Sequence, residues 1–381
     1  RELETTIWFP AAGPPEESGS AVPDTAGGPY PVILFAHGLS GTPEGAEGLL
    51  RSLAAAGYVV AAPLFPLSGG GGPHKPDAAD VVNQPGDLSF LIDELVAASK
   101  AKNGDLAGMI DPKAIGIAGH SNGGITVLGA TAHSCCRDER IKAVAALSAS
   151  PAPYPGGKYS FAKMPPFLVV HGTADDLVPY DGMARTFNQA RGPKVLLTVE
   201  GGGHGASISV DGPGGPSLLA TITDFFDGYL RGDDDAIARL PDDAEAGATS
   251  ILAATDPGSK EKTPVAPRVE YDRTMTVTPR TNLSDGDVVT VTWSGFSPGG
   301  VVNILQCGPD RSSGAAGCDL TTAAILHPDP TGEGELQLTI IEGPVGDSIC
   351  DAQSPPCVII ANDDSSTDPA DMIEVKIRFK K

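Results

Sequence analysis

A serine flanked by glycines is the clearest chemical signal in this sequence. Ser121 is the central residue of Gly119-His120-Ser121-Asn122-Gly123, a G-x-S-x-G pattern typical of a nucleophilic serine in a tight turn between a strand and a helix. The apolar residues 114–118 predict that strand, and residues 125–130 predict the start of the helix. Because 48 of the 381 residues are glycine, the pattern is weak alone and depends on residues that could act with the serine.

An acid and a base follow the serine along the chain. Asp175 comes shortly after the apolar residues 167–170, and His204 follows the apolar residues 195–199. A neutral imidazole can accept the serine proton near pH 7, and a carboxylate on its other nitrogen fixes the tautomer. The order Ser121, Asp175, His204 is the order found in α/β-hydrolases. We therefore predict a catalytic triad of these residues, working through an acyl-enzyme intermediate.

The donors of an oxyanion hole are predicted upstream and next to the serine. Residues 31–36 form an apolar run that leads into His37-Gly38-Leu39, and a turn of this kind places one donor in such enzymes. We expect the backbone N–H groups of Leu39 and Asn122 to hold the oxyanion. His37 and His171 are interpreted as structural loop histidines rather than as rival bases. The alternative is that all these motifs are ordinary glycine turns, with the acid and the base as surface loop residues.

The composition bounds the class of protein. A chain of 381 residues with 40% hydrophobic residues is long enough for two domains with ample cores. No apolar run reaches the roughly 20 residues that cross a bilayer, and no cofactor or metal is required. The net charge of −22 argues against nucleic acid and anionic membranes as partners. The sequence begins at Arg1 without a signal peptide, and we expect a processed or trimmed form.

The six cysteines lie in three couples that are close in sequence: Cys135 and Cys136, Cys307 and Cys318, Cys350 and Cys357. The two C-terminal couples favour disulfides, and hence an oxidising compartment outside the cell. A zinc site is the alternative, although no C-x-x-C spacing occurs and His327 is the only histidine nearby. The adjacent couple is left open between buried thiols and a vicinal bridge.

The chain divides into two regions of different periodicity. Strands are expected at 4–9, 31–36, 58–62, 114–118, 141–147, 167–170 and 195–199, and helices at 46–56, 84–101, 125–130, 181–190 and 218–230. This alternation predicts an α/β fold with a mainly parallel sheet covered on both faces. Beyond it, residues 288–293 and 374–379 alternate with a period of two, which predicts a small all-β sandwich.

These observations set the predicted domains. We expect a catalytic domain over residues 1–254, a Pro-containing linker over 255–267 and a sandwich over 268–381. Residues 66–86 form a Gly/Pro-rich insertion, which could be a lid over the substrate or a surface loop.

The first domain resembles the α/β-hydrolases grouped with dienelactone hydrolases, platelet-activating-factor acetylhydrolases and bacterial cutinase-like polyester hydrolases. The motifs that carry this resemblance are Phe35-Ala36-His37-Gly38-Leu39, Gly119-His120-Ser121-Asn122-Gly123-Gly124, His171-Gly172-Thr173-Ala174-Asp175 and Gly203-His204-Gly205. The resemblance places the acid at Asp175 rather than Asp176. Asn122 stands where many relatives have methionine or glutamine. Leu39 stands where polyester hydrolases have an aromatic residue, and Ser148-Ala149-Ser150-Pro151 stands where they have a tryptophan, so these two places do not support an aromatic polymer as substrate.

The C-terminal region resembles the neocarzinostatin family of small secreted β-sandwich proteins. The resemblance rests on Val277-Thr278-Pro279, Leu283-Ser284-Asp285-Gly286, Val288-Val289-Thr290-Val291, Gly295-Phe296 and Gln306-Cys307. It implies the pairs Cys307–Cys318 and Cys350–Cys357.

Taken together, the sequence predicts a secreted, monomeric serine ester hydrolase that acts on a small-molecule or polymeric ester. One alternative is a protein that binds a small molecule or a polymer through the sandwich. Another is an amide hydrolase or acyltransferase that uses the same triad.

Overall fold

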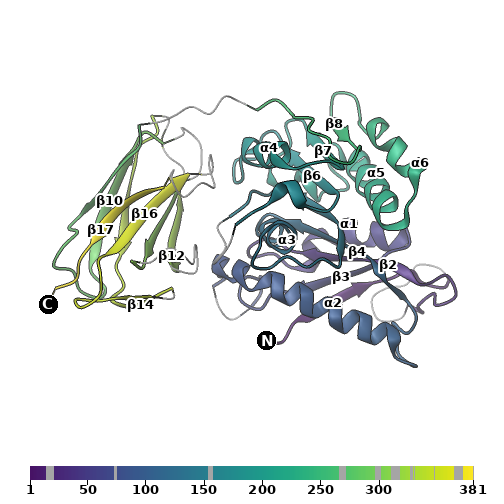
Figure 1. The fold of residues 1–381 in the computed structure, drawn as a ribbon, viewed down its shortest axis with the longest axis horizontal. Helices are drawn as coiled ribbons and strands as arrows, with labels where there is room; N and C mark the ends of the chain where they lie inside the picture. The colour runs from purple at the N-terminus through teal and green to yellow at the C-terminus, as the bar shows by residue number, and fades with distance from the viewer. Residues whose placement is uncertain are drawn as a thin grey trace. The chain divides into compact units, whose positions relative to one another are not determined.

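The structure is a computed structural model. It describes residues 1–13, 21–72, 75–152, 158–265, 272–296, 302–309, 318–326, 329, 331–346, 348–363 and 372–380. Two compact units are present, a hydrolase-like unit formed mainly by residues up to 263 and a sandwich unit formed mainly by residues from 264 (Figure 1). His74 and His327 lie outside the described residues. No helix in the described part of the chain is long and apolar enough to cross a membrane.

An eight-stranded sheet forms the centre of the hydrolase-like unit, in the order β1-β3-β2-β4-β5-β6-β7-β8. Its strands are β1 (Glu4–Trp8), β2 (Tyr30–Ala36), β3 (Val59–Leu64), β4 (Ile110–His120), β5 (Ile141–Leu147), β6 (Phe167–Gly172), β7 (Lys194–Val199) and β8 (Thr249–Ala254). The six strands from β2 to β7 are parallel, whereas β1 and β8 are antiparallel edge strands. The predicted α/β architecture is therefore confirmed.

Helices cover both faces of this sheet, as Figure 1 shows. They are α1 (Glu47–Ala55), α2 (Gln84–Lys100), α3 (Asn122–Ala132), α4 (Tyr180–Gln189), α5 (Gly215–Phe226) and α6 (Asp234–Arg239). α1 and α5 share one core with Ile33 and Phe35, which are alternate residues of β2 and so point to the same face. α2 packs against α3, and α3 lies against β4 and β5.

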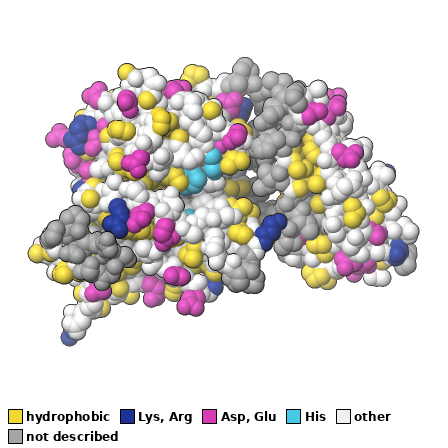
Figure 2. Space-filling model, turned by 180° about the vertical axis from the view of Figure 1, so that it is seen from behind, with side chains coloured by type: hydrophobic (Ala, Val, Ile, Leu, Met, Phe, Trp, Pro, Cys, Tyr) yellow, Lys and Arg dark blue, Asp and Glu magenta, His cyan; other side chains and the backbone are white. Residues whose placement is uncertain are grey.

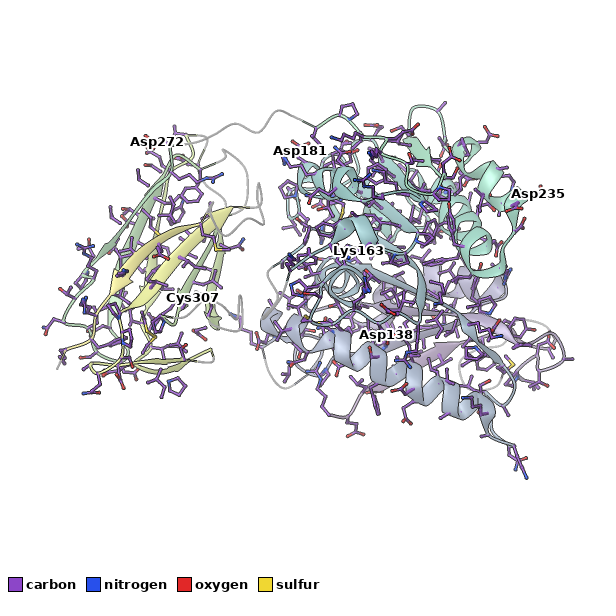
Figure 3. All side chains as sticks on the ribbon, in the orientation of Figure 1. Asp138, Lys163, Asp181, Asp235, Asp272 and Cys307 are labelled. Carbon is purple, nitrogen blue, oxygen red and sulfur yellow. A yellow bond between two sulfur atoms is a disulfide. The ribbon has the colours of Figure 1, made fainter. Side chains whose placement is uncertain are left out.

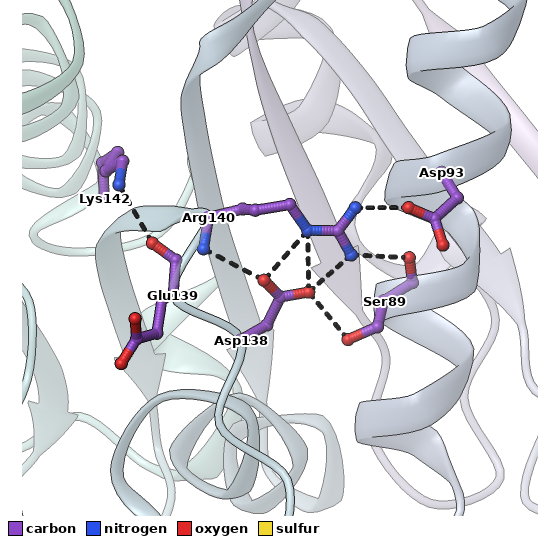
Figure 4. A network of polar contacts seen from close by, with 6 residues as sticks. All are labelled: Ser89, Asp93, Asp138, Glu139, Arg140 and Lys142. Carbon is purple, nitrogen blue, oxygen red and sulfur yellow. Dashed lines mark hydrogen bonds and ion pairs between the residues drawn. The ribbon is translucent and has the colours of Figure 1, made fainter.

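A charged cluster attaches α2 to the turn before β5 (Figure 4). The guanidinium of Arg140 donates to the carboxylate of Asp138 and to Asp93 on α2, and Ser89 on α2 donates to Asp138 at 2.9 Å. Burial alone would raise the pKa of Asp138, but the hydrogen bonds from Arg140 hold that pKa below its usual value.

The first residues of the predicted linker, 255–263, belong to the first unit. Gly258 N–H donates to the carbonyl oxygen of Gly192 at 2.7 Å, and the side chain of Asn188 exchanges two hydrogen bonds with the backbone of Thr263. The reason is that β8, which was not predicted, brings the chain back along β7. Residues 255–263 therefore follow the surface of the first unit.

The second unit contains two antiparallel sheets and a short hairpin. Its strands are β9 (Thr274–Thr278), β10 (Val288–Ser294), β11 (Val302–Cys307), β12 (Cys318–Leu326), β13 (Gly334–Thr339), β14 (Gly343–Val345), β15 (Ser348–Cys350), β16 (Cys357–Asp363) and β17 (Ile373–Ile377). Alternate residues of β10, including Val289, Val291 and Trp293, enter one shared core. This architecture is the predicted small all-β domain.

All six cysteines are joined in disulfides: Cys135–Cys136, Cys307–Cys318 and Cys350–Cys357. The two pairs implied by the resemblance are confirmed, and Cys307 is labelled in Figure 3. The adjacent couple, left open by the sequence, is a vicinal bridge in the turn after α3.

Candidate active site

Ser121 lies between the end of β4 and the first residue of α3, in a strained backbone conformation with φ 54° and ψ −120°. Two glycines make this turn possible. A Cβ on Gly119 would lie 2.2 Å from the carbonyl oxygen of Gly123, and a Cβ on Gly123 would lie 2.0 Å from that of Ala36. The predicted tight turn between a strand and a helix, called the elbow below, is therefore present, and its glycines are required by close backbone contacts.

Strained serines mark three neighbouring strand ends. Besides Ser121, Ser40 in the loop after β2 and Ser148 directly after β5 have positive φ values of 59° and 44°. The other non-glycine residue with positive φ in the described part of the chain is Asn282, in the sandwich. Backbone strain of this kind concentrates at functional sites.

Asp175 and His204 are in direct contact. His204 Nδ1 lies 2.9 Å from Oδ2 of Asp175 and 3.1 Å from Oδ1. Asp175 is buried, whereas the neighbouring Asp176 is exposed. With Nδ1 donating to the carboxylate, Nε2 of the neutral ring is the nitrogen that can accept a proton.

Backbone contacts fasten the loop of Asp175 to the loop of His204. Ala174 N–H donates to the carbonyl oxygen of Gly202 at 2.9 Å, and Gly201 N–H donates to Oγ1 of Thr173 at 2.8 Å. Ser207, at the end of the short helical turn η4 (His204–Ser207), donates to the hydroxyl of Ser148 at 2.8 Å. The loop of His204, the predicted base, is thus supported by residues that follow β5, β6 and β7.

His120 also contacts the predicted base, and the sequence did not single this residue out. Its Nε2 lies 3.1 Å from the carbonyl oxygen of His204, to which it donates, and the two rings are 4.8 Å apart. Burial lowers the pKa of His120 to about 4, so the ring is neutral near pH 7. The signal available in the sequence was its position between the strand and Ser121.

The two predicted structural histidines, His37 and His171, have different surroundings. His37 is buried, with Nδ1 2.8 Å from the carbonyl oxygen of Gly38 and Nε2 3.0 Å from the N–H of Phe65. Both nitrogens are used within the scaffold, which agrees with a structural role. The loop position predicted for His171 is wrong, because this residue lies within strand β6. Its Nε2 is 3.3 Å from Oδ2 of Asp175, so it contacts the predicted acid directly.

The predicted oxyanion donors lie on separate elements. Asn122 is the first residue of α3, where backbone N–H groups have no acceptor within the helix. Leu39 lies in the loop after β2, and its side chain is exposed. That loop is hydrogen-bonded to the 66–86 segment, because Ser40 N–H donates to Ser68 O at 2.8 Å and Gly70 N–H donates to Gly41 O at 2.9 Å. The described part of this segment is therefore folded against the site.

Histidine side chains reach the surface of the first unit in Figure 2, with hydrophobic side chains beside them. Among the described histidines, those that are not buried are His120 and His204. One group of described residues could hold a metal ion, namely His133, Cys135 and Cys136, but its two sulfur atoms are joined to one another.

Comparison with known proteins agrees with this architecture. The chlorophyllase family matches residues 10–172, and the TAP-like protein family, also of the α/β-hydrolase fold, matches residues 133–226. The N-terminal region is an α/β-hydrolase domain. A ferulic acid esterase structure from Streptomyces cinnamoneus covers 61% of this chain and 84% of its own, with 22% identity and a TM-score of 0.44.

The C-terminal region carries a neocarzinostatin-family domain, matched over residues 275–379. Macromomycin from Streptomyces macromomyceticus is 41% identical over 66 residues, which is 17% of this chain. The match spans 45% of macromomycin's own length.

Proposed function

We propose that this protein is a secreted serine hydrolase that cleaves carboxylic esters. Ser121 Oγ attacks the ester carbonyl as Nε2 of His204 takes its proton, and Asp175 stabilises the resulting imidazolium. The N–H groups of Leu39 and Asn122 bind the oxyanion. The alcohol leaves with the proton from His204, and water then hydrolyses the acyl-enzyme by the same steps in reverse. Three disulfides and the neocarzinostatin-family domain support an extracellular location.

The observation that carries the proposal is the contact of 2.9 Å between His204 Nδ1 and the buried Asp175, at the same sheet edge as a strained serine. Two other histidines in the described part of the chain, His37 and His120, are poorer candidates for the base. His37 uses both ring nitrogens elsewhere, and His120 has its Nε2 bonded to the backbone of His204.

The substrate should be apolar next to the reacting carbonyl. Leu39 and Leu67 are exposed large hydrophobic residues, and they flank the hydrogen bond between Ser40 and Ser68. Exposed apolar side chains beside a predicted oxyanion donor favour an ester with an apolar acyl or alcohol group. Within this class of apolar esters, the more specific substrate that we propose is a polyester.

A second function concerns the sandwich domain, which has its own family match. It could bind a small molecule or a polymer surface and deliver the hydrolase to it. Removing residues 268–381 separates the two functions: turnover of small esters is retained and adsorption to a polymer is lost. Equal adsorption with and without these residues would contradict this second function.

The central test is an ester panel with Ser121→Ala as the control. The panel runs from short p-nitrophenyl esters to polyesters and includes matched amides. We expect the wild type to cleave esters faster than amides, and Ser121→Ala to lose this activity. Ester turnover by Ser121→Ala at the wild-type rate would refute the mechanism, and faster amide cleavage would reassign the reaction.

A further inference from the structure

A buried chain of polar groups connects the two elements that carry the predicted oxyanion donors. It runs from the loop after β2, through Ser68 and Gln84, to Thr126 on α3. We propose that this chain, centred on Gln84, sets the spacing between the two donors. Gln84 is then a positioning residue, which touches neither the substrate nor the reacting atoms. This inference rests on the proposed function.

The first half of the chain fastens the loop of Leu39. Ser40, the next residue, donates its N–H to the carbonyl oxygen of Ser68 at 2.8 Å. The side-chain amide of Gln84 donates through Nε2 to Oγ of the same Ser68, also at 2.8 Å. The backbone position next to one donor is therefore held, through a single residue, by the first residue of α2.

The second half reaches the helix of Asn122. Thr126 Oγ1 donates to Oε1 of Gln84, and Thr126 Oγ1 also lies 3.2 Å from the carbonyl oxygen of Asn122, one helical turn earlier. α3 is a short, rigid element, so fixing Thr126 fixes the first turn of the helix and with it the N–H of Asn122. Gln84 thus contacts both sides through the two ends of one amide.

Burial makes this arrangement specific. Ser68 is 1% exposed, and Gln84 and Thr126 are fully buried at 0%. Apolar packing, as at Leu88 and Ile92 further along α2, could hold the elements together equally well. Hydrophobic contact is non-directional, however, whereas hydrogen bonds allow only a narrow range of lengths and angles. A buried amide bonded at both ends therefore defines one relative position of its neighbours.

The oxyanion donors must be placed accurately, which is why hydrogen bonds that fix their spacing would affect catalysis. Oxyanion donors act when they lie about 2.7–3.1 Å from the developing charge. A displacement of about 1 Å at a catalytic site can cost about 100-fold in rate. Since the oxyanion forms in the transition state, removing the hydrogen bonds through Gln84 should lower kcat and leave KM nearly unchanged.

The experiment compares Thr126→Val and Gln84→Leu with wild type on a short p-nitrophenyl ester. Each removes a link of the chain, and Thr126→Val nearly preserves the side-chain shape. We expect kcat to fall by about 10-fold or more, KM to stay within about 2-fold, and affinity for an alkyl boronic acid, which mimics the tetrahedral state, to fall in parallel with kcat. Thr126→Ser, which keeps the hydroxyl, should retain most of the wild-type kcat.

Thr131→Val is the matched control. Thr131 is buried on the same helix, and its hydroxyl donates to the carbonyl oxygen of Val127 at 2.6 Å. It takes no part in the hydrogen bonds that run through Gln84. Its kcat should stay near the wild-type value. Rates are expressed per serine titrated with a fluorophosphonate, so that misfolded protein does not count.

The outcomes separate this inference from the function on which it depends. If wild type turns over the ester, Ser121→Ala does not, and Thr126→Val and Gln84→Leu keep kcat and boronate affinity, the inference is wrong and the function stands. Equal losses in Thr131→Val would also overturn it. Absence of turnover in the wild type would contradict the proposed function and the inference together.

Discussion

The two units of this chain hold their turns in different ways. In the hydrolase domain, three serines with strained backbone conformations lie at or just beyond the carboxyl ends of β2, β4 and β5. In the sandwich, Cys307–Cys318 and Cys350–Cys357 close short segments at strand ends. A large sheet with a continuous core can tolerate local strain, while a domain of about 110 residues gains more from cross-links. Backbone strain therefore marks the candidate site in the hydrolase domain, whereas the two disulfides of the sandwich serve the stability of that domain.

The comparison can be tested because each unit contains one tryptophan. Trp8 on β1 packs against the core of the hydrolase domain, and Trp293 on β10 lies in the core of the sandwich. Replacing either tryptophan by phenylalanine leaves a fluorescent reporter of the other unit. Each prediction below can then be assigned to the unit in which its effect arises.

The largest effect is expected from Asp175→Asn. An amide cannot stabilise the imidazolium and favours the wrong tautomer of His204, so kcat for an ester should fall about 10⁴-fold. Both tryptophan-reported unfolding transitions should shift little. Steady-state kinetics on a p-nitrophenyl ester measures the change.

Asp176→Asn is the matched control, since Asp176 is the exposed neighbour. Its kcat should equal that of the wild type. A large loss in Asp176→Asn with a small one in Asp175→Asn would exchange the assignment of the acid.

The next effect tests the close contacts at the elbow. Gly123→Ala puts a Cβ 2.0 Å from the carbonyl oxygen of Ala36, so the turn must move. We expect the free energy of unfolding reported by Trp8 to fall by about 3 kcal/mol or more, with loss of ester turnover. Gly86→Ala, in the first turn of α2 with nothing within 4 Å, should leave stability unchanged or raise it by up to about 1 kcal/mol. Similar losses in both variants would show that the elbow is no tighter than an ordinary helix.

The third prediction concerns the sandwich. Replacing Cys307 and Cys318 by alanine opens a bridge with a sequence separation of 11, which the chain-entropy relation values at about 3 kcal/mol. The transition reported by Trp293 should shift by that amount, and turnover of small esters should not change. The same replacement at Cys135 and Cys136, adjacent in sequence, closes no loop and should cost little by this relation. A larger loss at the vicinal pair than at the sandwich pair would contradict the entropic account.

Sequence patterns were sufficient for the elements whose residues are buried on both faces. The parallel strands were predicted to within a few residues because continuous apolar runs, such as residues 167–170, are bounded by proline or glycine. β8 was missed because Thr-Ser-Ile-Leu-Ala-Ala has no strong strand signal, and it is a strand through its pairing with β7. The attachment of residues 255–263 follows from the same pairing and was missed for the same reason.

The candidate site shows a similar division. The order of Ser121, Asp175 and His204 was sufficient to propose roles for them, and the structure brings the last two into contact. The contacts of His120 and Gln84 could not be predicted, because each joins groups that are far apart in sequence. Local motifs therefore identify candidate reacting groups, whereas their supports require the folded chain.

The smallest effect is a pH dependence that arises from His120. Burial lowers its pKa from 6.5 to about 4, with smaller contributions from His204, Asp175 and His171 around it. Between these values the unfolded chain binds a proton that the folded protein does not bind, so stability rises with pH in this window. The free energy of unfolding reported by Trp8 should therefore fall by about 2 kcal/mol from pH 7.5 to pH 5 because of this residue.

His120→Asn isolates this contribution, because asparagine keeps a donor for the carbonyl oxygen of His204 and does not titrate. The variant should lose about 2 kcal/mol less than the wild type on acidification, while the transition reported by Trp293 stays the same in both proteins. A common slope in the two Trp8 transitions would mean that the folded protein protonates His120 as readily as the unfolded chain. The ring of His120 donates through Nε2 to the backbone of His204. That result would therefore mean that this contact to the proposed base does not depend on a neutral His120.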